Sequence, residues 1–245
     1  ARSVVPDIPI HLSTQANVTN GEAARFWFEQ GVARLNLARE LSLAEIQEVR
    51  GMVAGELEIF VHGALCISYS GRCMLSNYMT GRDANQGACA HPCRYSYSLV
   101  EEKRPGEHFP VEEDERGTYI FNSKDLCMIE HIPSMIDSGV SALKIEGRMK
   151  GINYLASVVK VYREAIDRYY QDPADFAVQP DWLVELARID RRGYCHGFYF
   201  DDPQQTVPEY NLKQGADTHR FIGKILTTHD NGQALMAVRN KCQVG

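Results

Sequence analysis

The sequence predicts an α/β fold of the TIM type, and two observations carry that prediction. Apolar runs typical of strands alternate with segments of helical period at a repeat of about two dozen residues, which is the pattern of βαβ units and a parallel sheet. Each predicted strand is also followed by polar or charged residues, as at the active face of a barrel. These residues are Gln15, Arg39, His62, Lys124 and the set Lys144, Glu146 and Arg148.

About five strand–helix units are present, three fewer than a closed (β/α)8 barrel needs. We therefore expect an incomplete barrel, with the missing strands preceding Ala1 in a longer protein. The predicted organisation is the C-terminal part of a barrel at 1–200 with a Cys-rich insertion at 63–118, a linker at 201–219 and the start of a small β domain at 220–245.

The first half of the chain supplies three predicted strands and two predicted helices. The strands are expected at 8–13, 33–37 and 57–61. A helix is expected from about Asn20 to Gly31. A second helix begins after Ser42, because Ser42 and Glu45 stand at the two positions of a capping box.

The second half continues the alternation after a charged, proline-bearing insertion or hairpin at 98–117. We expect a strand at 119–121, a helix from 122–125 to about 135, a strand at 140–145 and helices at 153–170 and 182–189. The runs 221–227 and 234–238 flank Asn231 and Gly232, a dipeptide that favours a tight hairpin turn. This hairpin is the expected start of the small β domain.

Four of the seven cysteines, Cys66, Cys73, Cys89 and Cys93, lie in the glycine-bearing loop after the third predicted strand. Grouped thiolates suit a soft metal or an iron–sulfur cluster. Zinc sites use Cys pairs about two to four residues apart. Because only Cys89 and Cys93 meet that spacing, we favour an iron–sulfur cluster over zinc. Ordinary buried thiols are the plain alternative, and Cys127 is a possible substitute ligand.

Composition and charge narrow the class of protein. At 245 residues and 44% hydrophobic, the chain can bury a real core. The formal charge of −6 requires any nucleic-acid contact to come from a local basic patch. The N-terminal stretch has neither a signal peptide nor a membrane-spanning run, and the cysteine number is odd. We expect a cytoplasmic protein without membrane insertion.

Charged residues at the strand ends are candidates for binding and catalysis. Lys144, Glu146 and Arg148 alternate after a predicted strand, so they form either an anion clamp or ion pairs that brace the barrel. His62 stands four residues before Cys66, which permits a thiol-protease pair, but equally a packed histidine. The sequence has no His-Glu-x-x-His or Gly-x-Ser-x-Gly motif.

Arginine and tyrosine residues are interleaved around the cysteines. Such side chains grip an RNA backbone and stack on an extruded base, although solvated loop charge explains them nearly as well. The candidates for substrate binding are Arg72, Arg82, Arg94 and Tyr95.

The run EIFVHGALCISYSGRC resembles the signature of the collagenase-like peptidases of unassigned mechanism. The segments NQGACAHPCR, TYIFNSKDLC and SALKIEGRMKG continue the match in order, and IPIHLSTQANVTN is similar to a barrel segment of the same family. The resemblance spans about 8–200. It implies a TIM-type barrel followed by a small C-terminal β domain.

The resemblance also implies a function. Beside the protease label, members of this family hydroxylate a tRNA wobble uridine or an rRNA cytidine, and others take part in oxygen-independent ubiquinone hydroxylation. In several branches, cysteines of this loop bind a [4Fe-4S] cluster, and NQGACAHPCR is similar to the RNA-hydroxylating branch. We expect conversion of tRNA uridine to 5-hydroxyuridine with a [4Fe-4S] cluster and a small carboxylated co-substrate such as prephenate.

Two alternatives remain open at this point. One is a collagenase-like peptidase. The other is an iron–sulfur protein that works with a protein partner in ubiquinone hydroxylation.

Overall fold

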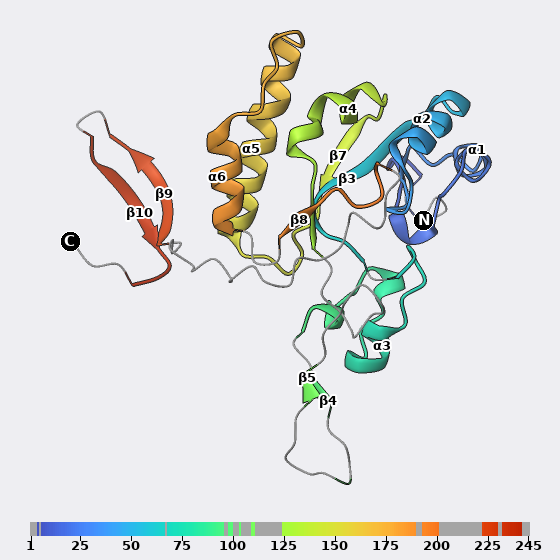
Figure 1. Cartoon of the computed structure of the whole chain (residues 1–245), viewed down its shortest axis with the longest axis horizontal. Coiled ribbons are helices and arrows are strands. Elements are labelled where there is room, and N and C mark those ends of the chain that lie inside the picture. Colours follow the sequence, from blue (N-terminus) through green and yellow to red (C-terminus); the bar gives the residue numbers. More distant parts are fainter. Residues whose placement is uncertain are drawn as a thin grey trace.

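The structure is a computed structural model that describes residues 4, 6–66, 68–95, 98–99, 103, 109–110, 124–189, 193–200, 222–229 and 232–241. Its main sheet has the strand order β1, β2, β3, β6 and β8, with β7 also paired to β3. These strands are β1 (His11–Leu12), β2 (Arg34–Asn36), β3 (Glu56–Ala64), β6 (Asp125–Cys127), β7 (Ala142–Ile145) and β8 (Tyr194–Cys195). Helices pack along this sheet (Figure 1).

The helices of the main body are α1 (Gly21–Glu29), α2 (Leu43–Met52), α3 (Leu75–Thr80), α4 (Ile132–Asp137), α5 (Ile152–Gln171) and α6 (Pro180–Ile189). The 3-10 turns are η1 (Thr14–Ala16), η2 (Ala84–Gln86), η3 (Pro92–Arg94) and η4 (Ile129–His131). The capping box predicted for α2 is confirmed, since Ser42 Oγ accepts from Glu45 N–H and the Glu45 carboxylate accepts from Ser42 N–H. In Figure 1, α1 and α2 lie together at one end of the sheet, and α5 and α6 lie at the other.

Two short antiparallel pairs lie outside the main sheet. The pair β4 (Ser98–Leu99) and β5 (Phe109–Pro110) agrees with the hairpin expected in the insertion. The pair β9 (Gly223–Thr228) and β10 (Ala234–Val238) confirms the C-terminal hairpin. The predicted linker at 201–219 and the predicted strand at 119–121 lie outside the described residues.

The parallel sheet is confirmed for most strand pairs, but not for all. Pairs β1–β2, β2–β3, β3–β7 and β6–β8 are parallel, whereas β6 runs antiparallel to the end of β3. The described strands form an open sheet and show no barrel closure.

The prediction of a helix that starts at 122–125 is wrong. Asp125–Cys127 forms β6, and the helix α4 begins only at Ile132, with a proline in its first turn. Strand geometry wins here because Leu126 and Cys127 are buried between β3 and β8, and such tertiary pairing outweighs local propensity. Lys124 therefore lies directly before β6.

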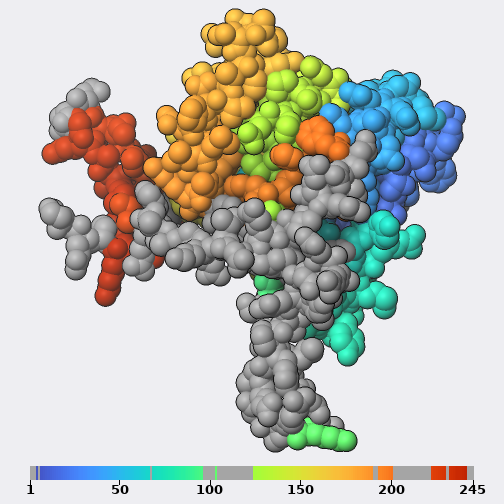
Figure 2. Space-filling model, viewed as in Figure 1, coloured from blue at the N-terminus to red at the C-terminus, as the bar shows by residue number. Residues whose placement is uncertain are grey.

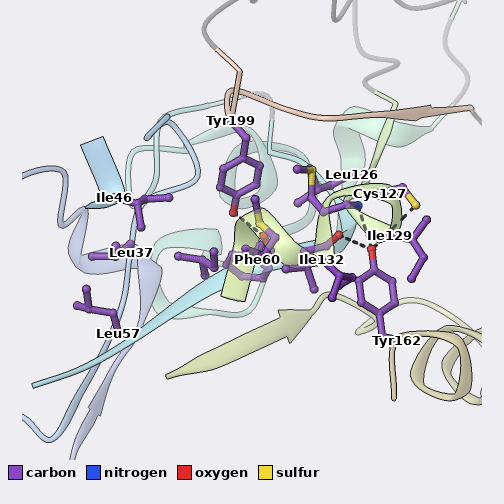
Figure 3. Close-up of a cluster of buried hydrophobic side chains, with 14 of the residues drawn as sticks. Leu37, Ile46, Leu57, Phe60, Leu126, Cys127, Ile129, Ile132, Tyr162 and Tyr199 are labelled. Atoms are coloured by element: carbon purple, nitrogen blue, oxygen red, sulfur yellow. Dashed lines mark hydrogen bonds between the residues drawn. The ribbon is translucent and has the colours of Figure 1, made fainter. Parts of the chain in front are cut away.

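Tyr162 of α5 ties the helix layer to the centre of the sheet. Its hydroxyl donates to Val61 O at 2.7 Å, accepts from Met128 N–H at 2.9 Å and lies 4.0 Å from Cys127 Sγ (Figure 3). The ring is buried in the core. This one phenol therefore satisfies polar groups of β3 and of the segment after β6.

A buried ion triad joins the cysteine loop to the sheet. The carboxylate of Asp125 is paired with the guanidinium of Arg94 and, at 2.8 Å, with Nζ of Lys150. Arg94 also donates to Leu65 O at 2.8 Å. Burial alone would raise the pKa of Asp125, but the two cations outweigh burial and hold that pKa below its usual range.

Among the described residues, no helix combines the length and the apolar character needed to cross a bilayer. The helices instead use apolar stripes to cover the sheet.

We predict that Tyr162→Phe destabilises the fold by about 1–3 kcal/mol, because it leaves buried polar groups with fewer partners. Urea unfolding of the full-length protein measures this change. The matched control is Tyr170→Phe at an exposed position of the same helix, where we expect less than about 0.5 kcal/mol. Equal losses for the two variants would contradict the role given to Tyr162.

We predict that Asp125→Asn destabilises the protein by about 3 kcal/mol at neutral pH, because it leaves two cations uncompensated. Since the folded-state pKa of Asp125 is depressed, its contribution is present above the unfolded pKa of about 4 and is lost as pH falls through the folded value. Unfolding titrations at several pH values should show the gap between wild type and variant closing in acid.

The control is Asp167→Asn, which removes the exposed pair with Arg163. We expect less than about 0.5 kcal/mol there. A gap for Asp125→Asn that stayed constant into strong acid would refute the triad's ionised state.

Candidate functional site

A cavity of about 320 Å³ opens where the chain leaves β1, β2, β3 and β7. Its lining includes Gln15 after β1, Arg39 after β2, Cys66 after β3 and Glu146 after β7. These loops meet because the carboxyl ends of parallel strands share one edge of a sheet. The expected gathering of strand-end side chains is therefore confirmed for these residues, whereas Lys124 and His62 do not line the cavity.

All four clustered cysteines line this cavity, namely Cys66, Cys73, Cys89 and Cys93. Burial raises the pKa of the Cys66 thiol. Burial also raises the pKa of Cys93 to about 11, with the three other thiols adding to the rise and Arg94 opposing it. The thiols are therefore close enough to influence one another, and all six cysteines that the structure describes are free.

Close backbone packing shapes the loop that carries the thiols. Gly71 has φ +72°, and a Cβ there would come within 2.0 Å of Gln15 O. Asn85 holds the backbone of Cys73, accepting its N–H at 2.9 Å and donating to its carbonyl at 2.8 Å. Asn85 is not predicted from the sequence, since an amide that clamps a distant backbone leaves no periodic signal.

His91 is a second residue of the cavity that is not predicted from the sequence. Its backbone, in the left-handed region at φ 59°, donates to Cys89 Sγ at 3.3 Å, and its ring lies 4.0 Å from a carboxylate oxygen of Glu146. Burial lowers the pKa of His91, and neighbouring arginines add to the effect while Glu146 opposes it. Its place between Cys89 and Cys93 in AHPC was the available signal.

Four thiols that line one cavity are the donor type that Cys-ligated iron–sulfur clusters use. In the described part of the chain, no three His, Cys, Asp or Glu side chains converge closely enough to hold one metal ion. A tetrahedral zinc needs its ligands to meet at one atom. A [4Fe-4S] cluster is held by four cysteine thiolates, and four cysteines line this cavity.

Of the predicted anion clamp, Glu146 is the most enclosed member. Its N–H donates to His62 O at 2.8 Å, and one carboxylate oxygen accepts from Arg148 N–H at 3.0 Å. Gly63 has φ +105°, and a Cβ there would come within 2.2 Å of Glu146 O, so glycine permits this close approach. Lys144 and Arg148 also line the cavity.

Lys144 and Arg148 already have protein partners. Lys144 Nζ lies 3.1 Å from a carboxylate oxygen of Glu58, which is the bracing ion pair considered from the sequence. The Arg148 guanidinium donates to Gly87 O in the cysteine loop. Both side chains therefore help to hold the walls of the cavity.

Arg39 was recognised as a strand-end residue but not as a site residue. Its guanidinium carbon lies 4.0 Å from the centre of the Phe60 ring. Burial lowers the pKa of Arg39, opposed by the nearby charges of Cys66, Glu146 and Glu40. Arg39 therefore places a cation near both Cys66 and Glu146.

The structure places His62 and Cys127 in the interior. The His62 ring is fully buried, lies 3.3 Å from the Tyr162 hydroxyl and packs against Tyr154 and Tyr194. Burial lowers its pKa to about 4, so the ring is neutral near pH 7. Cys127 lies on β6 and packs against Tyr162 of α5, and it does not line the cavity.

The predicted RNA contacts divide into two groups. Arg94 is engaged in the buried ion triad, and the Tyr95 hydroxyl donates to Ala90 O at 3.0 Å. Arg72 and Arg82 are exposed on either side of α3, whose Tyr78 is 88% exposed. Figure 2 shows this teal segment standing out below α1 and α2, so it is accessible to a large partner.

The chain has relatives that are named for tRNA hydroxylation. The chain is 42% identical over 232 residues to "tRNA hydroxylation protein P1" of Bacillus subtilis (strain 168), which covers 95% of this chain and 55% of that protein. It is 39% identical over 288 aligned residues to "tRNA hydroxylation protein P" of Escherichia coli (strain K12), which covers 100% of this chain and 62% of that protein.

A third relative carries a different name. The chain is 36% identical over 231 residues to "Collagenase" of Porphyromonas gingivalis (strain ATCC BAA-308 / W83), which covers 89% of this chain and 54% of that protein. The chain thus spans between about half and two thirds of the length of these relatives. No solved structure matched significantly. The family signature described as Peptidase family U32 matches residues 1–209, and the chain belongs to that family.

Proposed function

We propose that the full-length protein hydroxylates a base of tRNA, with the wobble uridine as target and 5-hydroxyuridine as product. The observation that carries this proposal is the single cavity that gathers four thiols, Arg39 and Glu146 at the strand ends. The relatives named for tRNA hydroxylation, at 42% and 39% identity, support the substrate class.

We propose that Cys66, Cys73, Cys89 and Cys93 hold a [4Fe-4S] cluster. When bound, such a cluster supplies one-electron redox chemistry or organises the loop around the substrate. The protein contributes the positions of the thiols: Asn85 fixes the backbone of Cys73, and the N–H of His91 donates to Cys89 Sγ. Hydrogen bonds to cluster sulfurs are one of the means by which proteins set a reduction potential.

Conversion of C5–H to C5–OH removes two electrons from the base and adds one oxygen atom. The reaction therefore needs an oxygen donor and an electron acceptor, and we propose a small carboxylated co-substrate such as prephenate as a participant. Lys144 and Arg148 at the cavity are the candidate contacts for its carboxylate. Such an anion would compete with Glu58 for Lys144, so binding should loosen that ion pair.

A collagenase-like peptidase is the alternative, and the relative named collagenase favours it. The geometry gives it less support, because His62 is buried among tyrosines and the pKa of Cys66 is raised by burial. A nucleophilic cysteine needs a lowered pKa and an adjacent base. The third hypothesis, an iron–sulfur partner in ubiquinone hydroxylation, predicts a stable protein partner and altered quinone levels.

We predict that the full-length protein, purified without oxygen, carries stoichiometric iron and sulfide, and that Cys89→Ala loses most of both. The physical reason is that a four-thiolate site lacking one ligand holds the cluster weakly. Visible absorption with iron and sulfide assays makes the measurement. The matched control is Cys195→Ala, because Cys195 lies on β8 and does not line the cavity. This variant should retain the iron of the wild type.

We predict that deleting the gene abolishes 5-hydroxyuridine in the host's tRNA and that the wild-type gene restores it. Restoration should fail with Cys89→Ala and succeed with Cys195→Ala. Mass spectrometry of tRNA nucleosides provides the measurement. Unchanged hydroxyuridine after deletion would sink the proposed function, and cleavage of collagen-like peptides lost in Cys66→Ala would favour the peptidase instead.

A further inference from the structure

Two residues that line the cavity each carry a buried polar atom with no hydrogen-bond partner among the described residues. These atoms are Nε of Arg39 and Oε2 of Glu146. Both residues line the same cavity, and the charge of Glu146 acts on Arg39. Because buried polar groups are nearly always paired, an unpaired donor and an unpaired acceptor on two residues that line one cavity indicate a ligand that pairs with both.

Neighbouring contacts fix the orientation of each group. The guanidinium of Arg39 lies on the ring of Phe60 at 4.0 Å. Glu146 uses its other oxygen, Oε1, to accept from Arg148 N–H at 3.0 Å, and its backbone is held to His62 O and packed against Gly63. The free donor and free acceptor are thus presented by side chains that are already anchored.

The charges limit the chemistry of the ligand. A second carboxylate would satisfy Arg39 but would be repelled by the carboxylate of Glu146, and it would offer no proton to Oε2. The complementary ligand is a neutral group that carries a carbonyl oxygen beside an N–H. The Watson–Crick edge of uracil has this pattern, with N3–H between two carbonyls, and enzymes that modify an extruded base read that edge.

We propose that Arg39 and Glu146 bind the Watson–Crick edge of the target uracil, with Arg39 Nε–H donating to a ring carbonyl and Glu146 Oε2 accepting from N3–H. This inference rests on the proposed function, and it adds the residues that select the base. Held in this way, the base keeps its C5–C6 edge free for reaction. Cytosine fits less well, because its N3 is an acceptor and would face the Glu146 oxygen.

The test is anaerobic equilibrium binding of the full-length protein to an anticodon stem-loop RNA. The RNA carries either uridine or N3-methyluridine at the wobble position, and a second methylated RNA carries the modification at another loop uridine as control. We expect methylation of the wobble base to weaken wild-type binding roughly tenfold, because it removes the proton that Glu146 accepts. The control RNA should bind like the unmodified one.

Variants assign the effect to Glu146. In Glu146→Ala, unmodified RNA should bind roughly tenfold more weakly, and wobble methylation should have no further effect. In Glu146→Gln, the Oε1 position keeps its bond from Arg148, so an amide N–H2 replaces Oε2 and should shift preference from uridine toward cytidine. The matched control is Glu130→Gln, an exposed carboxyl outside the cavity, which should behave as wild type.

The outcomes separate this inference from the proposed function. If the wild type restores 5-hydroxyuridine in cells and binds the methylated and unmodified RNAs equally, base reading by Glu146 is refuted while the function stands. If the gene has no effect on tRNA and the protein binds neither RNA, the proposed function itself fails. A loss of binding on methylation that persists in Glu146→Ala would also overturn the assignment. This comparison uses one variant with two RNAs, so a folding defect of the variant does not affect it.

Discussion

The carboxylate of Asp125, held between Arg94 and Lys150, is the interaction on which the candidate site depends. Arg94 follows Cys93 directly, and Asp125 starts β6. Lys150 follows Glu146 by four residues in the chain. The buried triad therefore links the cysteine-bearing loop of the cavity to the segment that carries Glu146. A buried carboxylate is stable only when its charge is compensated. The chain therefore cannot move the cysteine loop away from the strand ends without exposing or unpairing this group.

Charge at this edge of the sheet serves two different ends. The sequence predicts Arg94, Lys144 and Arg148 as substrate contacts, yet each has a protein partner. Arg94 pairs with Asp125, Lys144 pairs with Glu58, and Arg148 donates to the carbonyl of Gly87. These contacts set the positions of loops that come from separate strands. Nε of Arg39 and Oε2 of Glu146 have no partner among the described residues, so a ligand can bond to them without displacing a protein group. Counting charges at strand ends thus locates a site, whereas pairing decides which charges a substrate meets.

The sequence predicted the parts of the fold that local chemistry dictates. The capping box of α2, the apolar stripe of α5 and the meeting of strand-end residues follow from short-range patterns and from the shared edge of parallel strands. It failed at β6, because only pairing with β3 and β8 makes Leu126 and Cys127 extended. The sequence could not predict whether the His62 side chain points into the cavity or into the core. The end of β3 is buried on both faces, so its residues do not alternate between apolar and polar.

Desolvation affects differently the two roles considered for these thiols, cluster ligand and nucleophile. Burial raises the pKa of Cys66 and brings that of Cys93 to about 11, so as free thiols both are protonated near neutral pH. A nucleophile must be ionised before it attacks, and the local environment opposes that state. A metal centre replaces the protons with its own positive charge, so ionisation is compensated where it occurs. The burial that weakens a protease mechanism is therefore compatible with the proposed cluster, in which metal charge compensates the thiolates. It also makes Arg39 and Glu146 more discriminating, because unmatched polar groups cost more where water is scarce.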